Sequence, residues 1–270
     1  MDPRRGSRIL IRAIAALAVG SIVHSPTLAQ SSFSDNEFVT WSDVGWGGIP
    51  ASGNISDVLE KNFNSVFAST NDLMQIGIPG NAGHSIIFDS ADAVIAYLPA
   101  NGTPSSLTVT LLDPVQTSAG SLGSQVAALD LNVAFNDAGL LKGNSNVLFG
   151  NLVLTGFTND LAFLNGMTVR GLLSEANNIL GGGPTPDPTL SFEDFDGVLL
   201  SVNDSFNGGP AFASFDDQHL QLPPSTTAAP EIDRSSVLSE MTLLLGALAV
   251  LRGRASARRK SRPSTPTCYA

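Results

Sequence analysis

The sequence predicts an α+β fold, a single mixed domain with several amphipathic helices and a small sheet. Apolar residues recur at helical spacing in several segments and alternate at strand spacing in others. The chain of 270 residues is 43% hydrophobic, which is enough for one well-buried core. No repeat of fixed period stands out, which argues against a solenoid or propeller. We therefore expect helices to supply most of the core.

Residues 1–29 are typical of a secretory signal peptide. Four arginines precede an apolar stretch at 13–23, and Thr27 and Ala29 occupy the −3 and −1 positions of a cleavage site. This stretch is shorter than the roughly 20 residues that span a bilayer, although an uncleaved anchor is the alternative. The pattern does not decide between Sec and twin-arginine export. The arginines are Arg4, Arg5, Arg8 and Arg12.

Two helices are predicted in the first half of the body. Apolar side chains over residues 55–67 fall on one helical face, with Asn54 and Asp57 placed as the N-cap and its partner. Residues 90–98 form a shorter helix that ends before Pro99, because proline disfavours helical geometry in the residue that precedes it.

Two further helices are predicted in the second half. Residues 169–180 carry an apolar stripe that ends at three glycines, 181–183. Residues 192–206 carry apolar side chains at intervals of three and four, with Ser191 as the N-cap and a Gly-Gly-Pro stop at 208–210. Residues 182–188 then form the loop between these helices.

Strand signals are shorter than helix signals. Leu107, Val109 and Leu111 alternate with other residues, and 147–154 is an apolar run with β-forming residues. Residues 74–78 and 85–88 are weaker strand candidates. Residues 125–135 are ambiguous, because an alternating pattern follows an alanine-rich stretch, so helix and strand both stay open.

The body, residues 30–221, is strongly acidic. Residues 31–230 contain three basic and twenty acidic side chains, a net charge of −17. Such a body repels phosphate backbones, so no nucleic-acid partner is expected. The single cysteine, Cys268, lies near the end of the chain, so the body forms no internal disulfide.

The chain ends in segments of fixed order. A linker at 222–229 precedes Pro230, Glu231 and Ile232; a mostly apolar stretch at 235–251, a basic cluster at 252–262 and a tail at 263–270 follow. Because positive charge stays on the cytoplasmic side, this order predicts a short membrane span with the body outside. The basic residues are Arg252, Arg254, Arg258, Arg259, Lys260 and Arg262.

This order resembles the PEP-CTERM sorting signal of surface and matrix proteins from exopolysaccharide-producing bacteria. Ile232 stands where the family has a second proline, and Glu240 interrupts the apolar stretch. The resemblance implies cleavage near Pro230 and Glu231 by exosortase, a membrane protease-transpeptidase. A plain C-terminal anchor is the alternative.

The body is similar to a domain of uncharacterised secreted bacterial proteins. The stretches that carry this similarity are SADAVIAYLPANGTPSSLT, ALDLNVAFNDAG and MTVRGLLSEANNILGGG. The similarity implies one coherent domain, and no activity comes with it.

Catalytic signals are weak. A serine hydrolase needs a serine, a histidine and an acid together, and the Gly-x-Ser-x-Gly elbow of one such class is absent. His84, Ser85 and Asp89 supply the three residue types, but a loop histidine is the expected interpretation. The sequence therefore predicts no catalytic residue and no cofactor.

Some residues are candidates for binding. Asp216, Asp217 and His219 are possible metal ligands, yet an exposed acidic loop explains them, so no metal site is predicted. Trp41 and Trp46 offer a platform for a sugar or, alternatively, a buried anchor.

Acidic residues cluster near the predicted helix at 192–206. Glu193, Asp194 and Asp196 lie in its first turns, where negative charge complements the positive helix end. Calcium binding by these residues or by Asp204 is the alternative, but the twelve-residue EF-hand pattern is absent.

These observations favour a non-catalytic structural or interaction role at the cell surface or in the extracellular matrix. The expected partners are signal peptidase and exosortase during export, then exopolysaccharide or surface components. The C-terminal helix would hold the chain in the membrane before processing. A secreted polysaccharide hydrolase using two carboxylates, and a carbohydrate- or calcium-binding module, are the alternatives.

Overall fold

The computed structural model describes residues 33–211 and 215–224. They form one domain of helices and two small sheets, which confirms the mixed α+β class. The elements are α1 (Asp43–Trp46), α2 (Ile55–Val66), η1 (Ala68–Thr70), β1 (Met74–Gly77), η2 (Gly80–Ala82), β2 (Ser85–Phe88), α3 (Ala91–Tyr97), β3 (Leu111–Leu112), α4 (Ser121–Asp137), η3 (Phe149–Asn151), β4 (Val153–Leu154), η4 (Asn159–Leu164), α5 (Val169–Leu180), α6 (Phe192–Asp204), α7 (Asp216–His219) and β5 (Leu220–Gln221).

The predicted signal peptide and sorting segment lie outside the described residues, as do residues 225–229 of the predicted linker. No helix within 33–211 and 215–224 is long and apolar enough to cross a membrane. The predicted span at 235–251 falls beyond this part of the chain.

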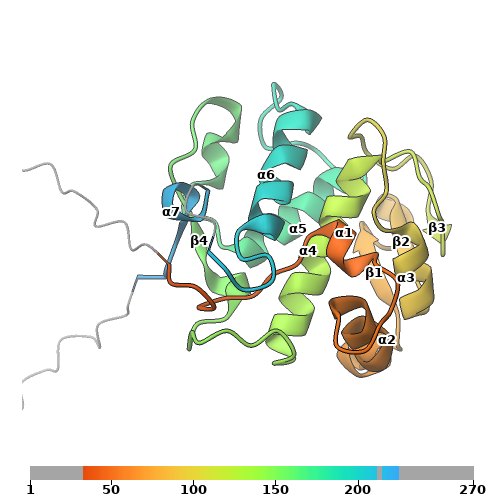
Figure 1. The fold of residues 1–270 in the computed structure, drawn as a ribbon. Coiled ribbons are helices and arrows are strands. Elements are labelled where there is room, and N and C mark those ends of the chain that lie inside the picture. Colours follow the sequence, from red (N-terminus) through yellow and green to blue (C-terminus); the bar gives the residue numbers. More distant parts are fainter. Residues whose placement is uncertain (1–32, 212–214, 225–270) are drawn as a thin grey trace, which may run out of the picture.

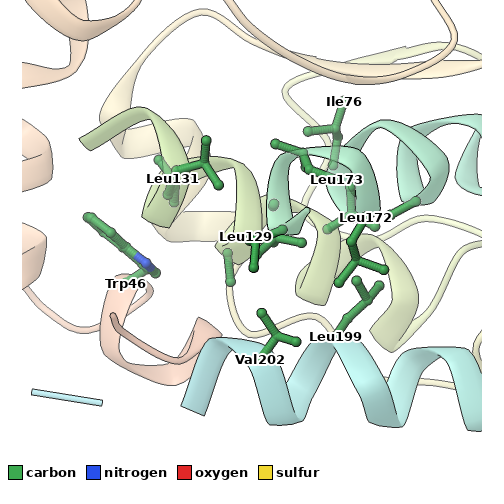
Figure 2. Packing of buried hydrophobic residues seen from close by; sticks show 14 of the residues in the cluster. Trp46, Ile76, Leu129, Leu131, Leu172, Leu173, Leu199 and Val202 are labelled. Carbon is green, nitrogen blue, oxygen red and sulfur yellow. The ribbon is translucent and has the colours of Figure 1, made fainter. Parts of the chain in front are cut away.

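Helix α4 forms the centre of the fold. It packs against α1, α5, α6, β1 and η3. Figure 2 shows Leu129 of α4 among side chains of the neighbouring helices, including Leu172 of α5 and Val202 of α6, and all three are fully buried. Residues 125–135, for which the sequence allows either a helix or a strand, are therefore helical. They lie in the core because neighbouring elements pack on several sides of α4.

The predicted helix starts are confirmed. The side chains of Asn54, Ser90, Thr168 and Ser191 each accept a hydrogen bond from a backbone N–H in the first turn of the helix that follows. These bonds satisfy donors that a helix cannot pair internally. Helix α3 also ends at Tyr97, two residues before Pro99, as predicted.

The larger sheet has the order β1-β2-β3. Strands β1 and β2 are antiparallel, with Ile76 opposite Ile86, and β3 runs parallel to β2, with Ile86 opposite Leu111. The strands predicted at 74–78 and 85–88 are thus confirmed within one residue. The second sheet pairs β4 with β5 in antiparallel register.

Two predicted strands are much shorter in the structure. The alternating segment at 107–111 is a strand only at its last residue, because the Thr108 N–H donates to the side-chain oxygen of Ser118. In the run 147–154, the N–H of Phe149 donates to Oδ1 of Asn136, and η3 replaces the strand before β4. Local side-chain acceptors therefore replace the strand ladder.

Both ends of the described domain lie on the same side. The N–H of Asn36 donates to the carbonyl of Gly209 at 2.7 Å, and the N–H of Thr40 donates to that of Phe206 at 3.0 Å. Figure 1 shows these ends at the left, near α7 and β4, with the β1-β2-β3 sheet toward the other side. Segments that lead into and out of the domain therefore start close together.

Candidate functional site

A hollow of about 800 Å³ lies between α4, α5, η1 and β1. Its polar lining includes Asp130 of α4, Gln75 of β1, and Ser174, Asn177 and Asn178 of α5. We call it the Asp130 hollow, because Asp130 is the only titratable side chain among its described lining residues. Its apolar lining includes Phe67, Leu73, Ile78, Pro79 and Pro184.

Asp130 is a carboxyl group that is partly removed from water. Its side chain is half-buried, and desolvation raises its pKa from 3.8 to about 7. Within the described residues it has no hydrogen bond or ion pair. Two cations of the body are already paired elsewhere: Lys61 with Asp57 at 2.7 Å, and Arg170 with Asp137 at 2.8 Å.

The amide side chains of the hollow direct their donors into the protein. Gln75 Nε2 donates to Ser85 Oγ at 2.9 Å, and Asn178 Nδ2 donates to the carbonyl of Pro184 at 2.8 Å. Asn177 uses both its amide oxygen and its amide nitrogen on backbone groups. Gln75 Oε1 and Asn178 Oδ1 accept no hydrogen bond from the residues that the structure describes, so both residues bring a free acceptor to the lining.

A second hollow, of about 490 Å³, lies between η4, α6 and α7. It brings together two groups that are far apart in the sequence: His219 of α7, and Glu193 and Asp194 of α6. The His219 ring stacks on Phe157, with centroids 4.5 Å apart, and its Nδ1 donates to the carbonyl of Thr155 at 3.0 Å. We call it the His219 hollow.

The His219 hollow holds no compact set of metal ligands. Within residues 33–211 and 215–224, no three His, Cys, Asp or Glu side chains are grouped closely enough to hold a metal ion. His219 is fixed by its ring contacts and its bond to Thr155. Glu193 and Asp194 are in the first turn of α6, where the helix end attracts negative charge, and Asp160 of η4 accepts from the Ser191 N–H just before that helix.

Asp216 corrects the expectation of an exposed acidic loop. It begins the short helix α7 and is fully buried. Neither carboxylate oxygen has a hydrogen-bond partner, and burial raises the pKa of Asp216 above its ordinary value. Asp216 does not line the His219 hollow, so the two groups act separately.

The structure does not form a catalytic triad from His84, Ser85 and Asp89. Ser85 is buried in β2, where its hydroxyl accepts from Gln75. Asp89 is exposed, and its backbone N–H donates to Asp113. No hydrogen bond joins the side chains of the three residues in the described part of the chain.

Trp46 is part of the interior and Trp41 is half-buried against it, so the two do not form an open sugar platform. Trp46 is fully buried, and its Nε1 donates to Oδ1 of Asn132 at 3.2 Å. The backbone N–H of Trp41 donates to the same oxygen at 2.8 Å. Asn132 Nδ2 in turn donates to Asn203 Oδ1 at 3.0 Å. The buried-anchor alternative therefore holds for Trp46.

Asp196 and Asp204 lie along α6 on the side of Asp43. Burial raises the pKa of both residues, and the nearby Asp43 adds to each shift. Ser121 Oγ donates to Asp196 Oδ2 at 2.8 Å, and Asp43 accepts from Ser124 at 2.7 Å. Asp196 and Asp43 therefore contact hydroxyl groups of α4, Asp204 accepts from Asn207 Nδ2 at 3.2 Å, and no tight ligand cage forms within the described residues.

No protein family model, curated protein or solved structure matches this chain. The site is therefore interpreted from its own chemistry. Sequence reasoning missed Asp130, although one signal was available. Asp130 is the only charged residue between positions 121 and 136, within an otherwise apolar and amide-containing segment. A lone carboxylate in such a segment indicates either a partner or an opening to solvent.

Proposed function

We propose that this protein is exported, sorted by exosortase through its C-terminal segment, and performs a non-catalytic interaction role at the cell surface or in the extracellular matrix. The order of the C-terminal segments carries this proposal: Pro230, Glu231 and Ile232, then the apolar stretch 235–251, then the basic cluster. The signal-peptide pattern at 1–29 supports the same route.

The position of the domain ends is consistent with this role. Because residues 36–40 form backbone hydrogen bonds with residues 206–209, both ends leave the domain on one side. A chain held at its C-terminus would then present the β1-β2-β3 sheet away from the attachment point (Figure 1). Strand β1 also lines the Asp130 hollow.

The Asp130 hollow also supports a binding role over hydrolysis. Glycoside hydrolysis normally uses two carboxyl groups on opposite sides of the scissile bond. The described lining of this hollow contains one, Asp130, although its pKa of about 7 suits a general acid. A single acid with acceptor amides suits ligand binding, and it lacks the second carboxyl group that hydrolysis requires.

Intact mass of the protein from the envelope and medium of its host tests the export route. We expect a mass that corresponds to residues from about 30 to about 230, with or without added glycan. A mass that extends to Ala270 would contradict exosortase processing and would indicate a plain anchor. A variant with Pro230→Ala and Glu231→Ala is the matched control, and it should keep its C-terminal segment.

A panel of matrix polysaccharides tests the non-catalytic role. The mature protein should release no reducing ends from any of them. Hydrolysis that is lost in Asp130→Asn, or in Glu193→Gln in the His219 hollow, would overturn this part of the proposal and leave the export part untouched.

A further inference from the structure

We propose that the Asp130 hollow is a binding site for a ligand that carries a primary ammonium group. Asp130 supplies the one acidic side chain of the described lining, which includes no lysine, arginine or histidine. The inference gives a ligand class to the interaction role proposed above, and it rests on that role without depending on export.

Hydrogen-bond capacity is the first argument. The amide nitrogens of Gln75, Asn177 and Asn178 donate within the protein. Gln75 Oε1 and Asn178 Oδ1 accept no hydrogen bond from the described residues, and Asp130 adds two further oxygens to the same lining. An acceptor-rich site complements a ligand with several donors, and an ammonium group has three donors and no acceptor.

Charge is the second argument. A carboxylate that loses water without gaining a partner is destabilised, and this is the situation of Asp130. A cationic ligand would supply the missing partner through a charge-assisted hydrogen bond, which is stronger than a neutral one. The same carboxylate repels phosphate, sulfate and uronate groups, so the hollow disfavours anionic ligands.

Size and walls are the third argument. A volume of about 800 Å³ lies within the range of small-molecule sites. Phe67, Leu73 and Ile78 offer apolar surface to the carbon skeleton of a ligand. A bare divalent cation is excluded on different grounds, because the described residues group no three metal-binding side chains there.

Two sources supply this chemistry: an amino-sugar unit of a polysaccharide, and a small diamine. Calorimetry at pH 7 separates them, with the full gene expressed in its host and the protein purified from it. The probes are an oligomer of glucosamine, an N-acetylglucosamine oligomer of equal length, and putrescine. The acetylated oligomer is the matched control, because it has the same ring but no charge.

We expect the glucosamine oligomer to bind at least about tenfold more tightly than the acetylated oligomer. Binding of putrescine alone would also support the ammonium site and would assign it to small amines. Measurable and equal affinity for the charged and acetylated oligomers, or no heat with either amine, would overturn the proposal. In that case, correct processing by mass would still leave the export proposal standing.

Variants locate the site. Asp130→Asn removes the charge without changing the shape of the side chain, and we expect at least a tenfold loss of affinity. Ser174→Leu, at an exposed position on α5, should fill the hollow and also abolish binding. Glu60→Gln, an exposed position on α2, removes one charge elsewhere and should bind normally. Unchanged affinity in Asp130→Asn would overturn the assignment.

Discussion

At the scale of single residues, asparagine side chains connect distant parts of the interior. Asn132 is fully buried and uses its whole amide: Oδ1 accepts from Trp41 and Trp46, and Nδ2 donates to the Trp41 carbonyl and to Asn203. Asn203 extends the chain of bonds to Gln125. These bonds fix the N-terminal segment and α6 onto α4.

Replacement of Asn132 should therefore destabilise the protein strongly. Asn132→Ala leaves the indole N–H of Trp46 and the Trp41 backbone buried without partners, and we expect the free energy of unfolding to fall by about 2–4 kcal/mol. Urea denaturation measures this change. Asn64→Ala, at an exposed position on α2, is the control and should change the stability by less than about 0.5 kcal/mol. Equal effects would show that the buried amide network contributes little.

Replacement of Asp130 should have the opposite effect and stabilise the protein, because the charge of Asp130 is unfavourable in the folded state. Its pKa is 3.8 in the unfolded chain and about 7 in the folded protein. The folded protein thus keeps a proton that the unfolded chain releases. The contribution of the Asp130 proton to the free energy of unfolding is fully present below about pH 3.8, and it is lost as pH rises through about 7.

Asp130→Asn removes this loss. At pH 8 we expect the variant to be more stable than the wild type by roughly 1–3 kcal/mol, less than the full shift implies because water reaches the hollow. Near pH 4 the two proteins should differ little. Urea titrations at both pH values measure this difference, with Glu60→Gln as the control of equal charge change. A variant that is less stable at pH 8 would contradict the unpaired state of Asp130.

At the scale of elements, burial on one face made most helices predictable. α2 and α5 each have one buried stripe, and their sequences show it as apolar spacing of three and four. α4 does not, because it is enclosed by neighbours and most of its residues are buried on all sides. A helix buried all round has no polar face, so its sequence can also be interpreted as a strand.

The sequence did not predict the Asp130 hollow for the same reason. Asp130 lies on α4, for which the sequence allows either helix or strand. The polar residues that line the hollow with it come from β1 and α5. Neither their proximity nor the orientation of the amides can be inferred from spacing along one chain. The capping residues, in contrast, act on neighbours three positions away, which is why the sequence predicts Asn54 and Ser191 as N-caps.

The central position of α4 leads to a packing prediction. Leu129→Ala should lower the free energy of unfolding by about 2–5 kcal/mol, because the side chain is fully buried and its removal leaves a cavity (Figure 2). Leu200→Ala on α6 is the matched control, since Leu200 is 41% exposed, and it should cost much less. Similar losses for both would mean that α4 is not the centre of the core.

At the scale of the whole molecule, the negative net charge and the burial of carboxyl groups both make the folded domain less stable as pH rises. Residues 31–230 carry a net charge of −17, so most carboxylates repel one another. Burial also raises the pKa of several acids in the folded state, namely Asp130, Asp196, Asp204 and Asp216. Hydrogen bonds from Lys61 and Thr189 lower the pKa values of Asp57 and Asp187, but these bonds lie at the exposed surface, so their opposing effect is small.

These signs predict that the folded domain is more stable in mild acid than in mild base. A group whose pKa is raised on folding stabilises the protein below its unfolded value of 3.8, and this contribution disappears as pH rises through the folded value. We expect the melting temperature to be higher at pH 5 than at pH 8, and the difference to narrow in 1 M salt, which screens the surface repulsion. Calorimetry at the two pH values checks this. A higher melting temperature at pH 8 would mean that the acids are paired in the folded state, and it would remove the unpaired carboxylate on which the ammonium site depends.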